Sequence, residues 1–236
     1  MRYLVFGATS GIGAAITEDA LERGMGVSCL GRNQEQLEKL AERGAVTHRV
    51  DLGDPLERDE LWKGLGRQQQ THVVYAAGLA VRATVDSMTP DGLRSMFEVN
   101  TLAPLELIHW AYALPAGSVV TLLSSNLARS PLPHTIGYSA SKAALEAACR
   151  ASASTLGKKG LRLNCIAPGP IDTPMLRGQF SDAAATEAGL AGLASQGPLG
   201  RVGEVSDVVR TLRYIEESTW LTGEVITIDG GYSCPS

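Results

Sequence analysis

Two side chains in the second half of the chain, Tyr138 and Lys142, have the types and spacing of an acid/base pair. Residues four apart lie on one face of an α-helix, so the ammonium group of Lys142 can lie beside the phenol of Tyr138. A phenol near a positive charge can donate or accept a proton. Such a pair arises by chance about 0.13 times in a chain of this composition, so by itself it could also be an exposed helix pair.

A second candidate is a glycine-rich segment near the start of the chain, residues 7–13 (GATSGIG). It follows a short apolar run and precedes a stretch with helical spacing. Glycines at such a turn let backbone N–H groups approach a pyrophosphate that rests on the helix N-terminus. Chance supplies a glycine triplet of this kind about 0.3 times per chain. The evidence for a dinucleotide-binding turn is therefore its position at the first strand–helix turn. A merely tight turn is the alternative.

The elements that must position these residues follow a regular alternation. Short apolar, β-branched runs predict strands at Tyr3–Phe6, Gly26–Leu30, Val46–Val50, His72–Ala76, Ser118–Leu123, Arg162–Ile166 and Glu224–Ile228. Helices are expected between them, among them a polar helix over 34–43, helices opened by Asp54-Pro55 and Thr89-Pro90, one starting near Tyr138 and one over 203–216. The Ala/Gly-rich stretch 181–200 is expected to be mobile. The pattern predicts an α/β fold with a parallel sheet covered on both faces.

Composition excludes several classes of protein. The chain has 236 residues and a net charge of −4, so it can bury a sizeable core but shows no electrostatic footprint for nucleic acid or an anionic membrane. It contains no run of about 18 apolar residues and no targeting signal, which predicts a cytoplasmic protein. The cysteines, expected to be reduced, and the histidines have no metal-ligand spacing, so no metal site is expected: Cys29, Cys149, Cys165, Cys234, His48, His72, His109 and His134.

Taken in order along the chain, these features resemble the short-chain dehydrogenase/reductase family. The ordered elements are the glycine turn, Asn100, Ser125 thirteen residues before Tyr138, Tyr138-x-x-x-Lys142, residues 164–171 (NCIAPGPI) and residues 229–231 (DGG). Together they extend from Leu4 to Gly231. The resemblance implies a Rossmann-like, doubly wound three-layer sandwich with a seven-stranded parallel sheet. It also implies a single dehydrogenase domain over 1–236, with a variable substrate lid at 174–200.

The resemblance implies a role for each of four catalytic residues. Tyr138 would donate a proton to the substrate oxygen in reduction or accept one in oxidation; near neutral pH this requires its pKa to fall by about three units from about 10. Lys142 and an oxidised nicotinamide would lower that pKa, and Lys142 would bind the nicotinamide ribose. Ser125, rather than its neighbour Ser124, would hydrogen-bond the carbonyl oxygen. Asn100 would position a proton-relay water, the alternative being a satisfied amide at a helix kink.

The cofactor implied by the resemblance is NADP(H), with NAD(H) as the alternative. Members that use NAD carry an acidic residue at the end of the second strand, where this chain has Arg32. A guanidinium suits a 2′-phosphate, although Arg32 could also be solvated or stack on adenine. Asp51 would receive the adenine amino group or form a loop-to-helix turn. The cofactor contacts implied are Gly7, Thr9, Ser10, Gly11, Ile12, Gly13, Arg32, Asp51, Ala77, Gly78, Asn100, Tyr138, Lys142, Pro168, Gly169, Ile171 and Thr173.

Apolar residues near these positions are candidates for a substrate pocket, although they could equally be core: Met175, Leu176, Leu127, Pro131 and Ile136. Two departures from the family pattern stand close to the site. Phe6 replaces the usual threonine before the first glycine, and residues 75–78 read YAAG instead of Asn-Asn-Ala-Gly. The second change removes an amide that braces the central sheet, which puts local rigidity in doubt.

These features predict a reductase or dehydrogenase that transfers a hydride between NADP(H) and a small or medium carbonyl or secondary alcohol. The alternative is a catalytically silent dinucleotide-binding sensor or scaffold, which has no need for Tyr138, Lys142, Ser125 and Asn100 together. A longer-branch epimerase or dehydratase is disfavoured because few residues follow the seventh strand. We expect a homodimer or homotetramer formed through the helices after Pro90 and Tyr138, and a monomer near 25 kDa in gel filtration would contradict it.

Overall fold

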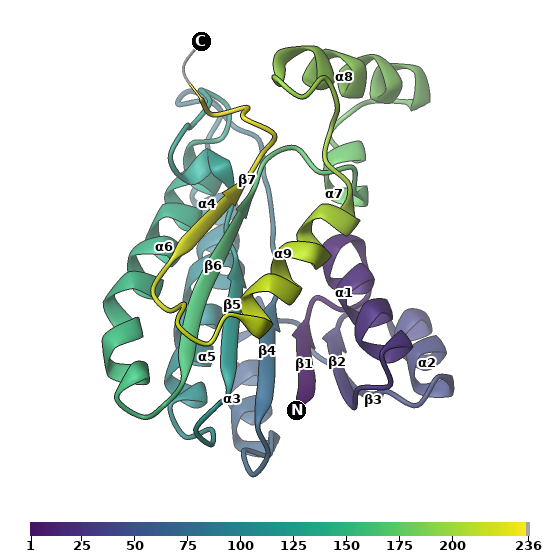
Figure 1. The fold of residues 1–236 in the computed structure, drawn as a ribbon. Helices are drawn as coiled ribbons and strands as arrows, with labels where there is room; N and C mark the ends of the chain where they lie inside the picture. The colour runs from purple at the N-terminus through teal and green to yellow at the C-terminus, as the bar shows by residue number, and fades with distance from the viewer. Residues whose placement is uncertain (235–236) are drawn as a thin grey trace.

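A parallel seven-stranded sheet forms the centre of the computed structural model, which describes residues 1–234 (Figure 1). The strands are β1 (Arg2–Phe6), β2 (Val27–Gly31), β3 (Val46–Arg49), β4 (Thr71–Tyr75), β5 (Val119–Leu123), β6 (Arg162–Pro168) and β7 (Val225–Ile228). Their order is β3-β2-β1-β4-β5-β6-β7. The chain starts at the centre, runs outward to β3, and returns to β4 on the other side of β1. This reversal creates a crevice at the carboxyl ends of the strands, where ligands bind in folds of this kind.

Helices cover both faces of the sheet, as the sequence predicted. They are α1 (Gly11–Glu22), α2 (Gln34–Glu42), α3 (Pro55–Gly64), α4 (Pro90–Phe97), α5 (Ala103–Ala111), α6 (Ile136–Gly157), α7 (Pro174–Arg177), α8 (Ala183–Gln196) and α9 (Val205–Glu217). One core cluster joins the sheet to α5 and α6, and the other joins it to α1, α2 and α9. Because both faces are covered, β1, β2, β4 and β5 are almost entirely buried.

Side-chain caps explain where several helices begin. The Asp54 carboxylate accepts a hydrogen bond from the backbone N–H of Leu56, and the Thr89 hydroxyl accepts one from Gly92. Each cap is followed by a proline at the first helical position, where no backbone donor is needed. These are the two helix starts that Asp54-Pro55 and Thr89-Pro90 predicted.

The long helix expected after Thr89-Pro90 is interrupted by a π-helix, η1 (Glu98–Leu102), between α4 and α5. Pro104 has no N–H to donate to the carbonyl of Asn100 four residues earlier, so a regular α-helix cannot continue through this point. The π-helix lengthens the turn by one residue. It carries Asn100 into the buried side of the helix.

The Ala/Gly-rich stretch that was expected to be mobile contains the 14-residue helix α8. Alanine favours the helix, and the Asp182 side chain accepts a hydrogen bond from Ala185 at its start. Phe180 packs on Gly189: a Cβ there would lie 2.1 Å from a ring carbon of Phe180, so a larger residue would displace that ring. Helix α8 lies beside the carboxyl ends of the strands, away from the main body of the sandwich (Figure 1).

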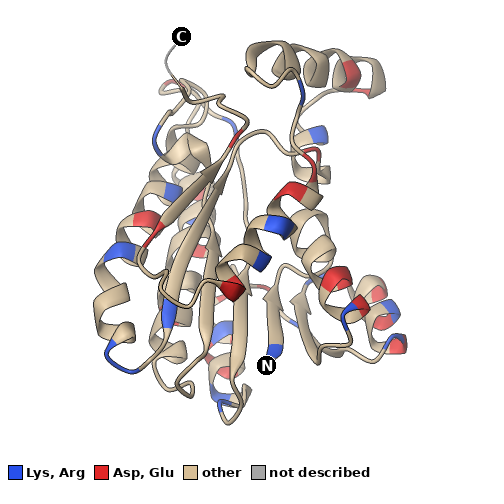
Figure 2. Cartoon of the chain, viewed as in Figure 1, with Lys and Arg blue, Asp and Glu red and all other residues tan. Residues whose placement is uncertain are grey.

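Basic and acidic residues are interspersed along the helices and loops of the chain (Figure 2). No helix within residues 1–234 is long and apolar enough to cross a membrane.

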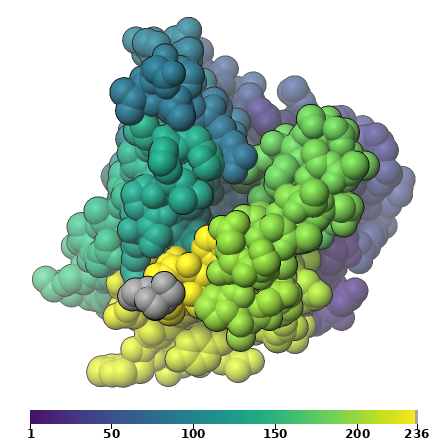
Figure 3. Space-filling model, turned by 90° about the horizontal axis from the view of Figure 1, so that it is seen from above, coloured from purple at the N-terminus to yellow at the C-terminus, as the bar shows by residue number. Residues whose placement is uncertain are grey.

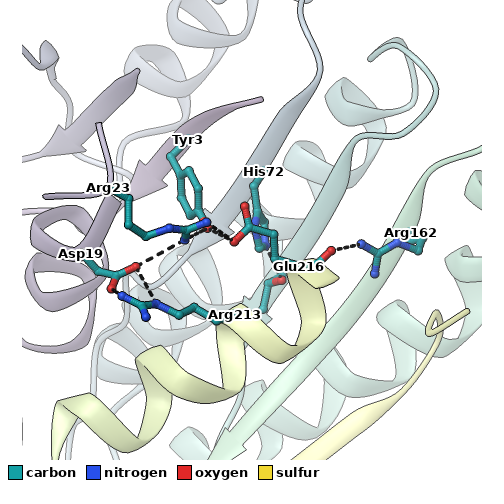
Figure 4. A network of polar contacts seen from close by, with 8 residues as sticks. Tyr3, Asp19, Arg23, His72, Arg162, Arg213 and Glu216 are labelled. Atoms are coloured by element: carbon teal, nitrogen blue, oxygen red, sulfur yellow. Dashed lines mark hydrogen bonds and ion pairs between the residues drawn. The ribbon is translucent and has the colours of Figure 1, made fainter. Parts of the chain in front are cut away.

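A polar network joins α9 to α1 and β1 (Figure 4). The Tyr3 hydroxyl donates to Oε2 of Glu216 at 2.9 Å, and Arg23 donates to the same oxygen at 2.8 Å. Arg213 of α9 pairs with Asp19 of α1. These contacts fix α9, which packs on one face of the sheet, to α1 and β1.

A histidine lies behind this network, with its ring against Tyr3. His72 is fully buried, and its Nε2 lies 2.9 Å from Oγ1 of Thr121. Burial, with a smaller effect from Arg162 and Arg23, lowers the pKa of His72 to about 3. The folded protein therefore keeps this ring neutral at pH values where the unfolded chain binds a proton.

We predict that His72 makes the protein acid-sensitive. Because the folded pKa lies below the unfolded value, stability falls as pH drops from about 6.5 towards 3, by about 2 kcal/mol between pH 7 and pH 5. His72→Gln puts an uncharged amide near Thr121 in place of the imidazole. It should remove most of this dependence of stability on pH. Urea unfolding at both pH values measures it, with His109→Gln on the surface as the control. Equal slopes in the wild type and His72→Gln would contradict the prediction.

Candidate active site

Three segments bring the predicted catalytic residues to the carboxyl edge of the sheet. Tyr138 and Lys142 lie on α6, Ser125 follows β5, and Asn100 lies in η1. Two adjoining cavities open here, one of about 380 Å³ and one of about 180 Å³. Lys142 lines the larger cavity, Ser125 the smaller, and Tyr138 lines both.

Lys142 is buried, and its ammonium group donates a hydrogen bond to the carbonyl oxygen of Leu123 at 2.7 Å. Its Nζ lies 5.8 Å from the centroid of the Tyr138 ring, as the four-residue spacing predicted. Burial lowers the pKa of Lys142 to about 8. Since no carboxylate pairs with this cation in the described chain, holding it here costs folding stability.

Tyr138 and Ser125 contact each other through their hydroxyl groups. Burial raises the pKa of Tyr138 above its usual value, and the hydrogen bond with Ser125 partly lowers it. The chain's own residues thus do not produce the fall in pKa that catalysis near neutral pH was expected to need. Ser125 Oγ accepts a hydrogen bond from the backbone N–H of Leu127 at 3.2 Å. Because the bond that lowers the pKa of Tyr138 is one donated to the phenol oxygen, Ser125 gives its own proton to Tyr138 here and must turn it to a carbonyl oxygen when a substrate binds.

Ser124, the alternative to Ser125, has a different partner. Its hydroxyl donates to Oε1 of Glu146 at 3.0 Å. Glu146 was not singled out from the sequence, although it follows Lys142 by one helical turn and therefore lies on the same face of α6. That spacing was the available signal. Ser125, and not Ser124, is the serine whose hydroxyl meets Tyr138.

The side chain of Asn100 is fully used within the protein. Its Oδ1 accepts from the backbone N–H of Leu79 at 2.9 Å, and its Nδ2 donates to the Leu79 carbonyl at 2.8 Å and to Ser141 Oγ at 3.0 Å. These bonds join the loop after β4 to η1 and α6. The geometry is that of a satisfied amide at a helix kink, and the water-positioning role of Asn100 stays a prediction.

The two departures from the family pattern pack against each other. The Phe6 and Tyr75 rings stack with their centroids 5.6 Å apart. The Tyr75 hydroxyl donates to the carbonyl of Val99 in η1 at 2.6 Å. The buried Arg58 also bonds η1, donating to Glu98 at 2.8 Å. Tyr75 therefore joins the π-helix to the central sheet, and the effect of the missing amide on local rigidity stays a prediction.

The glycine turn packs so closely that larger residues cannot replace Gly7 or Gly13. Gly7 has a φ of +80°, and a Cβ there would lie 2.7 Å from the backbone N of Ala77. A Cβ on Gly13 would lie 2.1 Å from the carbonyl oxygen of Gly7. At the start of α1, Ser10 makes no side-chain cap and the first turn holds no acidic residue. Its N–H groups are thus available to an anion such as a phosphate.

Most of the predicted cofactor contacts line the larger cavity: Gly7, Thr9, Ser10, Gly11, Ile12, Arg32, Asp51, Ala77, Gly78, Tyr138, Lys142, Pro168 and Thr173. Gly169 and Ile171 line the smaller one, whereas Gly13 and Asn100 line neither and support the wall from behind. Arg32 is 73% exposed, and its Nη1 lies 3.8 Å from Oδ2 of Asp51. The donor set and the close backbone approach fit a dinucleotide.

The smaller cavity has mostly apolar walls. Leu127, Met175 and Leu176 line it as predicted, but Pro131 and Ile136 do not. Sequence position alone suggested those two, and the turn before α6 directs the chain so that Leu132 and Thr135 take the lining positions. Figure 3 shows the segment 174–200, in green, separated by a hollow from the teal part of the chain. Residues that the sequence did not indicate complete the wall: Val81, Arg82, Gln179, Leu193 and Tyr232.

Comparison with known proteins gives matches along nearly the whole chain. A family model described as enoyl-(acyl carrier protein) reductase matches residues 7–233. A versicolorin reductase of Emericella nidulans is 32% identical, covering 97% of this chain and 94% of the relative. An L-xylulose reductase of Caenorhabditis elegans is 30% identical over 98% and 95%, and a glucose 1-dehydrogenase of Gluconobacter oxydans is 28% identical over 98% and 91%.

Solved structures agree with the fold. A short chain dehydrogenase/reductase family protein superposes with a TM-score of 0.86 at 27% identity, covering 99% of this chain and 97% of the other. An actinorhodin polyketide ketoreductase with NADPH superposes with a TM-score of 0.88 and a 4-hydroxyisoleucine dehydrogenase with NADH with 0.89, both at 24% identity. These two likenesses concern the fold alone.

We predict that Lys142 destabilises the folded protein. A pKa lowered to about 8 means that the charged form is disfavoured on folding, a cost that is complete below pH 8 and disappears by about pH 10.5. Lys142→Met should therefore raise the free energy of unfolding by about 2 kcal/mol at pH 7, a net value that allows for the lost hydrogen bond to Leu123. The same substitution should abolish activity.

This advantage should shrink as pH rises from 8 towards 10.5. Denaturant unfolding at pH 7 and pH 9.5 measures it, with the exposed Lys158→Met as the control. A Lys142→Met variant less stable than the wild type at pH 7 would contradict the prediction.

Proposed function

This chain belongs to the short-chain dehydrogenase/reductase family of NAD(P)-dependent oxidoreductases, and on that basis we propose that it transfers a hydride between NADP(H) and a small or medium carbonyl or secondary alcohol. One observation carries the proposal. Tyr138 lies where the two cavities meet, with Lys142 on one side and Ser125 on the other. A cofactor in the larger cavity and a carbonyl in the smaller one would both meet the Tyr138 hydroxyl.

The residues have separate tasks in the reduction. When bound, the reduced cofactor supplies the hydride. Ser125 donates a hydrogen bond to the carbonyl oxygen and stabilises the negative charge that develops there. Tyr138 then delivers its proton to the same oxygen. Lys142 presents a cation beside the phenol and toward the cofactor cavity, where ribose hydroxyls would accept its free protons.

The protonation state of Tyr138 suits reduction in one respect only. Burial raises its pKa above the usual value, so the phenol carries a proton at neutral pH but is a weaker acid, and Lys142 must offset this for the proton to be transferred. Oxidation of an alcohol requires the phenolate instead. The positive charge of an oxidised nicotinamide would favour that form, together with Lys142.

Arg32 supports NADP(H) over NAD(H), which remains the alternative. Its side chain is exposed at the edge of the larger cavity, and no carboxylate ends β2 to bind a ribose 2′-hydroxyl. The contact with Asp51 is a surface ion pair worth about 1 kcal/mol or less. A 2′-phosphate could therefore displace it at little cost.

The smaller cavity supports a substrate of modest size. Its volume of about 180 Å³ and its apolar walls suit a compact ketone or secondary alcohol. A silent dinucleotide-binding sensor is the second candidate, but it has no use for a buried lysine beside Tyr138. Because burying the Lys142 cation costs folding stability, we take its presence as support for a catalytic role.

A homo-oligomer is part of the proposal. Leu102 of η1, Leu105 of α5 and Tyr112 just after α5 are exposed along the segment that follows Pro90, and exposed apolar residues gathered in one segment are typical of protein interfaces. This is the segment through which the family resemblance predicts dimers or tetramers.

Cofactor binding tests the role of Arg32. Losing charge-assisted bonds to a 2′-phosphate should weaken NADPH binding by about ten- to a hundredfold in Arg32→Ala while leaving NADH binding within about threefold. Cofactor fluorescence titration measures both constants. Arg49→Ala, an exposed arginine on β3 outside the cavity, is the matched control. NADH binding as tight as that of NADPH in the wild type would overturn the NADP assignment.

Activity tests the role of Tyr138. A screen of small ketones with NADPH and NADH should find turnover in the wild type, and Tyr138→Phe should lower kcat by about a thousandfold because it removes the transferable proton. Its affinity for the cofactor should change little. Cofactor binding without turnover of any ketone or alcohol would instead favour the silent sensor.

A further inference from the structure

A buried carboxylate beneath the active site has no role in the mechanism above. Glu146 is only 2% exposed, on the turn of α6 that follows Lys142. Its Oε1 accepts the hydroxyl proton of Ser124 at 3.0 Å, and its Oε2 accepts from Nε of Arg129 at 3.2 Å. Nη1 of Arg150 lies 3.5 Å from the same Oε2. A carboxylate is buried only at a considerable cost, so these contacts matter to its placement.

The two loop contacts of Glu146 stand on either side of the catalytic serine. Ser124 directly follows β5 and precedes Ser125. Arg129 directly follows the 3₁₀ turn η2 (Asn126–Ala128), which comes after Ser125. One carboxylate on α6 therefore holds both ends of the short loop that carries the Ser125 hydroxyl. The same helix carries Tyr138, so the contacts also fix Ser125 relative to the proton donor.

The contact with Ser124 has a second consequence. Ser124 lines both cavities, and its hydroxyl would be a competing donor to a substrate oxygen if it were released. The Ser124 hydroxyl donates its hydrogen bond to Glu146 instead, and so it is not directed to an oxygen in the cavity. Only Ser125 is then left to donate to the carbonyl oxygen.

We propose that Glu146, together with Arg129, is a positioning element that fixes the Ser125 loop on α6 for catalysis. The inference rests on the proposed function, because it assigns the element's effect to the step in which Ser125 and Tyr138 act on one oxygen. Neither side chain touches the cofactor cavity. Loss of the element lowers kcat and leaves cofactor binding unchanged.

Two arginines provide a matched test. Arg129 and Arg150 have side chains 50% and 51% exposed, and both contact Oε2 of Glu146. Arg129 belongs to the loop, whereas Arg150 lies on α6 itself, four residues after Glu146, and cannot hold the loop. Arg129→Ala should lower kcat by about tenfold through misplacement of Ser125, with the NADPH dissociation constant and Tm little changed. Arg150→Ala should leave kcat unchanged.

Coupling to Ser125 separates positioning from a general structural effect. In a Ser125→Ala background the loop has no hydroxyl left to position, so adding Arg129→Ala should lower kcat no further. Glu146→Gln keeps an acceptor for Ser124 but offers Arg129 no carboxylate, and it should behave like Arg129→Ala. Equal losses in Arg129→Ala and Arg150→Ala, or additive losses in the double variant, would overturn the proposal.

Hydrogen exchange gives a readout that does not depend on turnover. Amides of residues 125–130 should exchange faster in Arg129→Ala than in Arg150→Ala or the wild type. If no carbonyl is reduced by the wild type but this difference is present, the proposed function fails while Glu146 still holds the loop. If exchange is the same in all three proteins, the positioning element itself is refuted.

Discussion

The hydrogen bond between the Lys142 ammonium and the Leu123 carbonyl is the interaction on which the site depends. It places a buried cation at the carboxyl end of β5, beside the half-buried phenol of Tyr138, in a position that costs stability. Such a cation persists only if the surrounding structure leaves it no alternative. Helix α6 must therefore be packed closely and held in register. A Cβ on Gly137, one residue before Tyr138, would lie 2.5 Å from Cε of Met96, so α6 meets α4 with no space to spare.

Several polar groups near this cation are satisfied by separate contacts within the protein. Asn100 joins the loop after β4 to Ser141, Tyr75 bonds the π-helix, and Glu146 bonds the loop after β5. Unpaired polar groups are costly at this depth, so each contact restricts the position of the residues that it joins. The departure at residue 75 illustrates the point: an aromatic hydroxyl stands where the family usually has an amide, and it bonds the carbonyl of Val99 in the π-helix.

The parts of the fold that follow from local pattern were predictable. Continuous apolar runs located all seven strands to within a residue or two at most ends, and cap residues such as Asp54 and Thr89 located helix starts. The helix after Thr89-Pro90 was predicted, but not its π-helical segment, because that depends on Pro104 acting with buried contacts from β4 and α3. Helix α8 was missed because its two glycines, Gly189 and Gly192, read as irregular until Phe180 is seen packed on one of them.

The sequence by itself determined the alternation of strands and helices and the pairing of Tyr138 with Lys142, since each follows from residue types at fixed local spacing, and its ordered motifs resembled the family to which the chain belongs. Only the tertiary structure decided how they are held. Glu146, Arg129 and Tyr75 act on residues from other elements, and no spacing along the chain records such contacts. The tertiary structure also excluded Pro131 and Ile136 from the smaller cavity and placed Arg82 and Tyr232 on its wall. A cavity is formed by segments distant in sequence, so its lining is a property of the packed chain.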